Sequence, residues 1–188
     1  MYALKGRNPE IVEELLGVLD SSQVNAANHD GDTALLLAAS RGYADVVEVL
    51  LQVDCLDIDI NAVNNAGLTA LMWAVEGDHV QVVRRLLSIP ELDANLTDNH
   101  GDTPLAEASR VGNLAMVEAL LACSRCDLNS QNNQGSTALM YAARRGHVQV
   151  VQRLLTIPGL DPNLTDVDGD TALAEACHFG KLAVIEAL

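Results

Sequence analysis

The chain has 188 residues, of which 49% are hydrophobic but only 3% aromatic, so we expect a core of Leu, Val, Ala and Ile. Its net charge of −15 excludes nucleic acid as a partner, because a phosphate backbone needs a basic footprint. No apolar run approaches the roughly 18 residues of a membrane span, and the N-terminus lacks the layout of a signal peptide. We therefore expect a soluble chain without membrane insertion.

The first residues, 1–28, are predicted to form a partial structural unit. Residues 10–16 mix glutamates with apolar side chains at helical spacing and indicate an amphipathic helix, and Gln23–Asn25 is expected to be a loop. Only Tyr2–Leu4 is left of the helix that would precede them.

A phrase containing glycine and threonine then recurs five times. The copies are Gly31–Leu35, Gly67–Leu71, Gly101–Leu105, Gly135–Leu139 and Gly169–Leu173. The first step from glycine to glycine is slightly longer than the three that follow, which are equal. A fixed period of this size predicts a stack of repeats, in which each unit buries its apolar face against its neighbours.

Each copy of the phrase is predicted to open a short helix. The threonine is the expected N-cap, and a glycine seven residues after the leucine suits a left-handed C-cap, which gives helices within 33–42, 103–112, 137–146 and 171–180. Pro104 fits the first helical position. The second copy has Asp78 in place of that glycine, so we predict a left-handed Asp78 and a weaker helix connection there.

A second, amphipathic helix is predicted after each of these glycines. Residues 148–155, for example, have apolar positions at helical spacing and end in the pair Leu154–Leu155. Each unit then closes with an asparagine whose side chain is expected to hydrogen-bond backbone groups of the loop; these are Asn25, Asn61, Asn95, Asn129 and Asn163.

A longer period, two units in length, lies over the first, since residues 65–120 match 133–188 at most positions. This indicates duplication of a block of two units. Trp73 and Tyr141 therefore share one helix position, which Glu107 and Glu175 occupy in the alternate copies.

The phrase, with Thr103-Pro104-Leu105 as its fullest copy, resembles the ankyrin repeat family. The resemblance implies an all-α ankyrin repeat solenoid of helix-turn-helix units with short hairpin-like turns. It divides a single array, 1–188, into a partial unit at 1–28, full units at 29–64, 65–98, 99–132 and 133–166, and a truncated unit at 167–188. The family's usual histidine after the leucine is absent from all five copies. Some ankyrin arrays are hydroxylated on the loop asparagine, which is left open for this chain.

The resemblance also implies a protein–protein interaction module that binds a partner protein or peptide. The expected surface is the concave face made by the turns and first helices, where aromatic and arginine side chains would anchor the partner. The candidates are Asp32, Arg41, Trp73, Asp102, Arg110, Tyr141, Arg144, Arg145, Asp170, His178 and Phe179. The arginines favour an acidic partner and the acidic turns a basic one, so the sign of the partner stays open, as does a merely solvated surface.

Two other functions stay open. The truncated ends favour a targeting or regulatory domain of a larger enzyme or effector. Alternatively, the array is a structural spacer that self-associates end to end through uncapped termini, although we expect a monomer.

No enzyme activity, catalytic residue, cofactor or metal is predicted. Asp166–Asp170 looks like the start of a calcium loop, but it is one copy of the repeat turn. Cys123 and Cys126 have the spacing of half a zinc site or a redox pair, yet no second pair exists, and Ile89 and Leu92 fill the same positions in a sister unit. Packing of reduced thiols is therefore expected for the four cysteines, which favours the cytoplasm or another intracellular compartment.

Overall fold

The computed structural model describes residues 14, 21–52 and 57–188. The expected helix remnant at Tyr2–Leu4, the helix at 10–16 apart from Glu14, and Cys55 lie outside these residues. The prediction of a loop at Gln23–Asn25 is wrong at its start, because helix α2 (Ser21–Val24) includes Gln23 and Val24. The chain separates into two compact units, residues 1–93 and 94–188.

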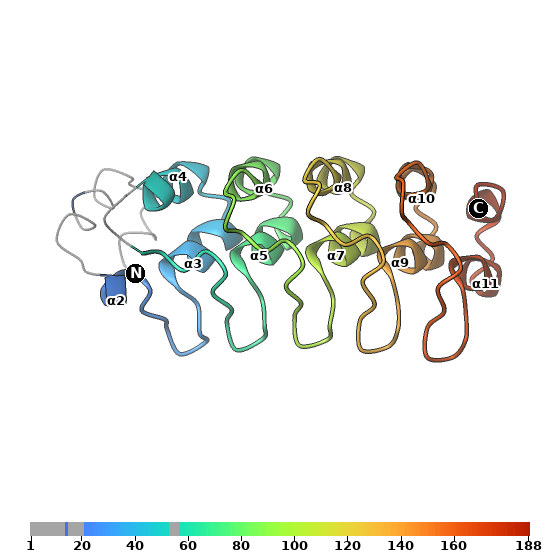
Figure 1. Cartoon of the computed structure of the whole chain (residues 1–188), viewed down its shortest axis with the longest axis horizontal. Coiled ribbons are helices and arrows are strands. Elements are labelled where there is room, and N and C mark those ends of the chain that lie inside the picture. Colours follow the sequence, from blue (N-terminus) through green and yellow to red (C-terminus); the bar gives the residue numbers. More distant parts are fainter. Residues whose placement is uncertain (1–13, 15–20, 53–56) are drawn as a thin grey trace. The chain divides into compact units, whose positions relative to one another are not determined.

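Helices account for all the regular structure of the described residues, which contain no strand. The first unit holds α2, α3 (Ala34–Ser40), α4 (Ala44–Gln52), α5 (Ala70–Glu76) and α6 (Val80–Leu87). The second holds α7 (Pro104–Val111), α8 (Leu114–Leu121), α9 (Ala138–Arg145), α10 (Val148–Leu155), α11 (Ala172–His178) and α12 (Leu182–Ile185). Figure 1 shows the pairing within each unit: α3 and α5 lie in one row and α4 and α6 in another, as do α7, α9 and α11 against α8 and α10. The predicted all-α architecture of paired helices is confirmed.

Threonine caps the start of every first helix, as predicted, and the predicted glycine is the left-handed C-cap of α7 and α9. In α3 and α11 the C-cap is Arg41 or Phe179, one residue before the predicted glycine. In every copy the threonine side chain accepts a hydrogen bond from the third residue of the helix, for example from Ala106 N to Thr103 Oγ1 at 3.2 Å. Gly112 and Gly146 end their helices with φ of 82° and 84°. Asp78 has φ of 57° and is the one non-glycine residue with positive φ in the described part of the chain, which confirms its predicted left-handed backbone.

Leucines and alanines of the first helices build the core. The leucine that ends the repeated phrase is at most 2% exposed in four copies, Leu35, Leu71, Leu105 and Leu139. Alanines such as Ala38, Ala74, Ala108 and Ala142 are buried beside them, and their small size lets neighbouring helices approach closely. The second helices add Val46, Val82, Met116 and Val150 from the other side.

The turns that precede the first helices are joined to one another by backbone hydrogen bonds. Asn65 N donates to Asp30 O in the first unit, and Asn133 N to His100 O and Val167 N to Gln134 O in the second, each at 3.0 Å. The turn glycines permit this approach: a Cβ on Gly101 would lie 2.8 Å from Asn133 N. The turns therefore stack from one repeat to the next inside each unit.

The loop asparagines bridge successive repeats with both atoms of their amide. Asn129 Nδ2 donates to Gly159 O at 2.7 Å, and Asn129 Oδ1 accepts from Asp161 N at 2.8 Å. Asn25, Asn61 and Asn95 make the same pair of bonds to the loop that follows. The predicted hydrogen bonding to the backbone is confirmed, and it links neighbouring repeats rather than closing a single loop.

Candidate functional site

Side chains on the first helices of the second unit form connected pairs across its repeats. We call this set, together with the turn residue Asp102, the first-helix surface; it consists of Asp102, Glu107, Arg110, Tyr141, Arg144, Glu175 and Phe179. Threonine caps fix where each helix begins, so equivalent positions of α7, α9 and α11 come into register. A side chain on one helix can then reach the neighbouring repeat.

Tyr141 of α9 is held by the turn of the preceding repeat. Its hydroxyl donates to Asp102 Oδ2 at 3.1 Å, while Asn132 Nδ2 lies 2.8 Å from Asp102 Oδ1 and 2.9 Å from Tyr141 Oη. Burial raises the pKa of Asp102, against the hydrogen bonds from Asn132 and Tyr141, which lower it. Burial, and then the charge of Asp102, raises the pKa of Tyr141 to about 12, so the phenol stays protonated as a hydrogen-bond donor.

Arg110 is engaged within its own helix. Its guanidinium contacts both carboxylate oxygens of Glu107 one turn earlier, at 2.7 and 2.5 Å. The hydrogen bond with Glu107 raises the pKa of Arg110. The positive charge of this side chain is thus compensated by the chain itself.

Arg144 makes the equivalent contact to the next repeat. Its Nε donates to Glu175 Oε2 at 2.8 Å, its Nη2 pairs with Glu175 Oε1, and Asp166 Oδ2 lies 3.8 Å from Nη2. Glu175 is only 4% exposed, so Arg144 supplies the partner that a buried carboxylate needs. The Arg144 Cζ atom also lies 5.9 Å from the centre of the Phe179 ring, and that ring lies 5.0 Å from His178.

The candidates in the first unit are arranged differently. Asp32 accepts from Asn64 Nδ2 at 2.9 Å, which matches the bond between Asp102 and Asn132. Trp73 takes the place of Tyr141, but its buried Nε1 has no hydrogen-bond partner within the described residues. Arg41, at the C-cap of α3, is exposed and donates to Leu37 O at 3.3 Å.

The structure therefore brings together some of the predicted residues. Asp102 meets Tyr141, and Arg144 meets Phe179, which contacts His178. The hydrogen bonds and ion pairs of the described chain do not join Asp32, Arg41 and Trp73 to one another, nor Asp170 to the other candidates. Arg145 is exposed at the end of α9.

Sequence reasoning did not identify the partners of these side chains, which are Glu107, Asn132 and Glu175. Glu107 was detectable, because it lies one helical turn before Arg110 on a predicted helix. Glu175 lies about one repeat after Arg144, and only the repeat register relates the two. The turn position that Asn132 shares with Asn64 recurs at the longer period of two units, so that period could have indicated its role.

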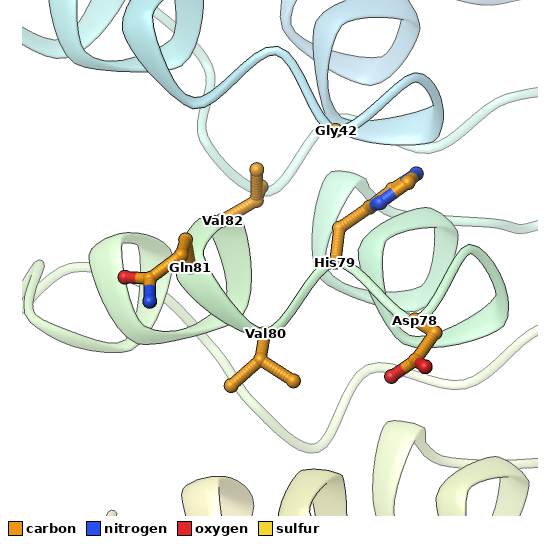
Figure 2. A pocket seen from close by; sticks show the side chains of 6 residues that line it. All are labelled: Gly42, Asp78, His79, Val80, Gln81 and Val82. Atoms are coloured by element: carbon orange, nitrogen blue, oxygen red, sulfur yellow. The ribbon is translucent and has the colours of Figure 1, made fainter.

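A pocket of about 320 Å³ lies in the first unit, at the start of α6, and is lined by Gly42, Asp78, His79, Val80, Gln81 and Val82. In Figure 2 the His79 ring points toward Gly42 of the preceding repeat. Its Nε2 lies 3.3 Å from Ser40 O, and a Cβ on Gly42 would collide with the ring. His147 makes the same contact with Gly112 in the second unit, so these histidines connect repeats and the pocket is a by-product of that packing.

Metal binding gains no support from the acidic turns. Asp166 Oδ1 accepts hydrogen bonds from Asp168 N and Asp170 N, both at 3.0 Å, so it serves the turn itself, as predicted. Across the described residues, no group of three or more His, Cys, Asp or Glu side chains could hold a metal ion. None of the helices described is both long and apolar enough to span a membrane.

Comparison with known sequence families gives a match to ankyrin repeats (three copies) over residues 1–98, 56–132, 85–166 and 105–188. The chain belongs to the ankyrin repeat family. No curated protein matches it significantly. Among solved structures, it is similar to the ankyrin repeat domain of Bcl-3, described as a unique member of the IkappaB protein family. The TM-score is 0.86 at 29% sequence identity, and the match covers 98% of this chain and 78% of that one.

Ankyrin repeat domains are generally protein-interaction modules, and no enzyme family matches the chain. The helix pairs, threonine caps and stacked turns described above are thus the framework of such a module.

Proposed function

We propose that the chain is a non-catalytic module that binds a basic segment of a partner protein through the first-helix surface and the adjoining turns. The observation that supports this most is the internal pairing of Arg110 with Glu107 and of Arg144 with Glu175. With these two cations compensated, the negative charges of Asp102 and of the adjoining turn outnumber the positive charge of exposed Arg145 at the end of α9. This favours a basic partner over an acidic one.

The last turn supplies that negative charge. Asp168 is exposed and Asp170 is half-buried, and no salt bridge in the described part of the chain involves either of them. The net charge of −15 acts in the same direction at longer range. Complementary charge of this kind speeds association and selects among partners more than it adds affinity.

Phe179 is the proposed apolar anchor beside these charges. Its side chain is 50% exposed, and the Arg144 guanidinium lies near its ring. Arg144 is itself fixed by Glu175, so the aromatic contact is formed before a partner arrives. A partner that covers Phe179 would bury apolar area with little loss of side-chain freedom.

Selection from a displayed library of random peptides tests this proposal. We expect the wild-type chain to enrich peptides with Lys or Arg around an apolar residue. Asp168→Lys should weaken the selected peptides about three- to tenfold, and Phe179→Ala by about tenfold or more, measured by fluorescence anisotropy.

Matched controls come from the second helices of the same unit. Glu118→Lys makes the same change of charge at an exposed residue of α8, and Leu182→Ala shortens a side chain that is 73% exposed on α12. Both should leave binding unchanged. Enrichment of acidic peptides, or binding lost in the controls but kept in Asp168→Lys and Phe179→Ala, would overturn the proposal.

A second candidate function is self-association through the outer side of α11 and α12. Leu173 is 46% exposed, whereas the equivalent Leu105 and Leu139 are each 2% exposed, and Leu182 and Leu188 are exposed as well. Large apolar side chains exposed on two neighbouring helices favour contact with a second copy. Sedimentation velocity tests it: a dimer at high concentration that disappears in Leu173→Glu/Leu182→Glu supports self-association, and a monomer at all concentrations refutes it.

We also propose an intracellular location. Cys123, Cys126 and Cys177 are all free thiols, which suits a reducing compartment.

A further inference from the structure

The loop after α8 contains a tight turn with a cysteine at each end. Cys126 N donates to Cys123 O at 3.3 Å, which closes a turn over Ser124 and Arg125. The sister loops form the same turn, from Leu92 N to Ile89 O and from Leu160 N to Ile157 O, with apolar side chains at both ends. One repeat has thus replaced an apolar pair with two thiols in an otherwise unchanged backbone.

The geometry of this turn suits a disulfide. The ends of a four-residue turn lie within about 7 Å of each other at Cα, and disulfides join Cα atoms about 4.4–6.8 Å apart. The Cys123 side chain, through its charge and a side-chain hydrogen bond, helps to raise the pKa of the Cys126 thiol, so the two side chains lie close together. The turn therefore brings the two cysteines to about the separation that a disulfide requires.

The surroundings distinguish the two sulfurs. Arg125 Nε donates to Cys123 Sγ at 3.3 Å, which places a positive charge beside that sulfur, the setting in which thiolates react. Cys126 Sγ donates to Leu120 O at 3.2 Å, and burial raises the pKa of the Cys126 thiol to about 12. Cys123 is thus suited to react first and Cys126 to follow.

We propose that Cys123 and Cys126 form a reversible disulfide within this loop when the chain meets hydrogen peroxide. The Cys123 thiolate attacks one peroxide oxygen and the O–O bond breaks, which gives a sulfenic acid and hydroxide; the hydroxide takes up the proton that the Cys123 thiol released on ionisation and becomes water. Cys126 then attacks the Cys123 sulfur, an S–S bond forms, and the hydroxyl leaves as a second water. Two thiols and one peroxide give one disulfide and two waters, so sulfur is oxidised and the peroxide oxygens are reduced.

The neighbouring repeat holds the backbone of this site in place. Asn95 Nδ2 donates to Arg125 O at 2.8 Å, and Asn95 Oδ1 accepts from Asp127 N at 2.7 Å, so bonds flank Cys126 on both sides. Oxidation removes the thiol hydrogen that Cys126 gives to Leu120 O. The oxidised loop therefore loses one hydrogen bond near the end of α8, which favours return to the dithiol when a reductant is present.

Peptide mapping of the intact 188-residue chain tests the proposal, because trypsin cuts at Arg125 between the two cysteines. After treatment with hydrogen peroxide and alkylation of free thiols, we expect peptides 111–125 and 126–144 to be joined, with a mass two hydrogens below their sum. The joined species should come from monomeric protein on a non-reducing gel and should disappear with dithiothreitol. Separate peptides with alkylated or over-oxidised cysteines, or linkage only in a covalent dimer, would overturn the proposal.

The sister loops provide the control variants. Cys123→Ile and Cys126→Leu restore the residues found at Ile89 and Leu92, so both variants should fold, as circular dichroism would show. In Cys126→Leu we expect Cys123 to accumulate sulfenic acid that a dimedone probe captures, and in Cys123→Ile we expect at least a several-fold slower oxidation of Cys126. Equal rates for the two single variants would contradict the assigned order of attack. The site does not depend on the proposed partner binding.

Discussion

At the scale of single residues, the backbone of Asp78 offers a direct test of conformational strain. A non-glycine residue in the left-handed region costs about 1 kcal/mol, and Asp78 has φ of 57°. We therefore expect Asp78→Gly to stabilise the chain by up to about 1 kcal/mol and to raise the melting temperature by about 2–4 °C in differential scanning calorimetry. A lower melting temperature would show that an interaction of the Asp78 side chain outweighs the strain.

Gly180 supplies the reverse experiment at the equivalent helix end. Its φ is 64°, and a Cβ would meet no atom within 4 Å. Gly180→Ala should therefore lower the melting temperature through backbone strain alone.

The Tyr141 hydroxyl is one of two hydrogen-bond donors that favour the ionised form of Asp102 and lower its pKa. Burial raises the Asp102 pKa in the folded chain, so the folded state binds more protons than the unfolded state between the ordinary and raised values, and stability falls as pH rises through that window. Tyr141→Phe removes a hydrogen bond that favours the carboxylate. We expect it to raise the Asp102 pKa further, as followed by carboxyl ¹³C NMR, and to cost about 1 kcal/mol of stability at neutral pH.

Arg145→Gln is the control for this titration, because Arg145 is an exposed residue of the same helix. It should leave the Asp102 titration almost unchanged. An Asp102 pKa that stays constant or falls in Tyr141→Phe would show that the hydroxyl does not stabilise the ionised carboxylate.

Sequence predicted which residues lie near the turns and first helices, but it did not predict the pairs they form. Arg110 and Arg144 are equivalent in the repeat, yet one pairs within its helix and the other with the next repeat. The difference comes from what stands at the neighbouring position, Tyr141 in one case and Glu175 in the other. The partner of each arginine thus depends on a side chain in the next repeat, and a pattern within one repeat does not predict it.

At the scale of structural elements, the asparagine bridges should carry a measurable part of the coupling between repeats. Asn129→Ala removes two hydrogen bonds to the following loop and leaves Gly159 O and Asp161 N to find other partners. We expect a loss of about 1–2 kcal/mol in urea unfolding followed by circular dichroism.

Asn163 is the matched control, since it holds the same position in its loop. Its amide contacts only Asp161 of its own loop within the described chain, at 3.4 Å. Asn163→Ala should cost no more than a few tenths of a kcal/mol. Equal losses in the two variants would mean that the bridge between repeats adds nothing to stability.

Helix boundaries were largely predictable because local chemistry fixes them. At the start of α7 the Thr103 side chain accepts a hydrogen bond from Ala106 N, and at its end the Gly112 N–H donates to Ala108 O. The start of the predicted loop at Gln23–Asn25 was missed, because α2 has neither a threonine cap nor a closing glycine in its sequence. Without these capping residues, the spacing of the repeats alone did not predict where the helix ends.

At the scale of the whole molecule, the net charge of −15 should oppose folding by self-repulsion. Raising NaCl from about 20 to about 300 mM shortens the screening length several-fold, so we expect the urea midpoint to rise. The rise should be smaller in Asp30→Asn/Asp168→Asn, which carries less charge in the turns. A midpoint that falls with salt would show that ion pairs such as Arg144 with Glu175 outweigh the repulsion.

The family was predictable from the sequence because its period and phrase recur five times, and the match over the full length confirms it. The single-array boundaries and the binding residues stay predictions. A partner binds exposed side chains, and the packing of the repeats does not determine which residue types occupy exposed positions. Only contacts such as those of Arg144 with Glu175 and Phe179 begin to restrict the choice.

The backbone bonds from turn to turn have a consequence for time scales. The amides of Asn65, Asn133 and Val167 lie in surface turns, yet each donates to a carbonyl of the preceding repeat. Their hydrogen exchange with solvent should therefore wait for neighbouring repeats to separate, and not for a single turn to open. A ligand that docks on these turns would meet a surface that has already lost its conformational freedom on folding.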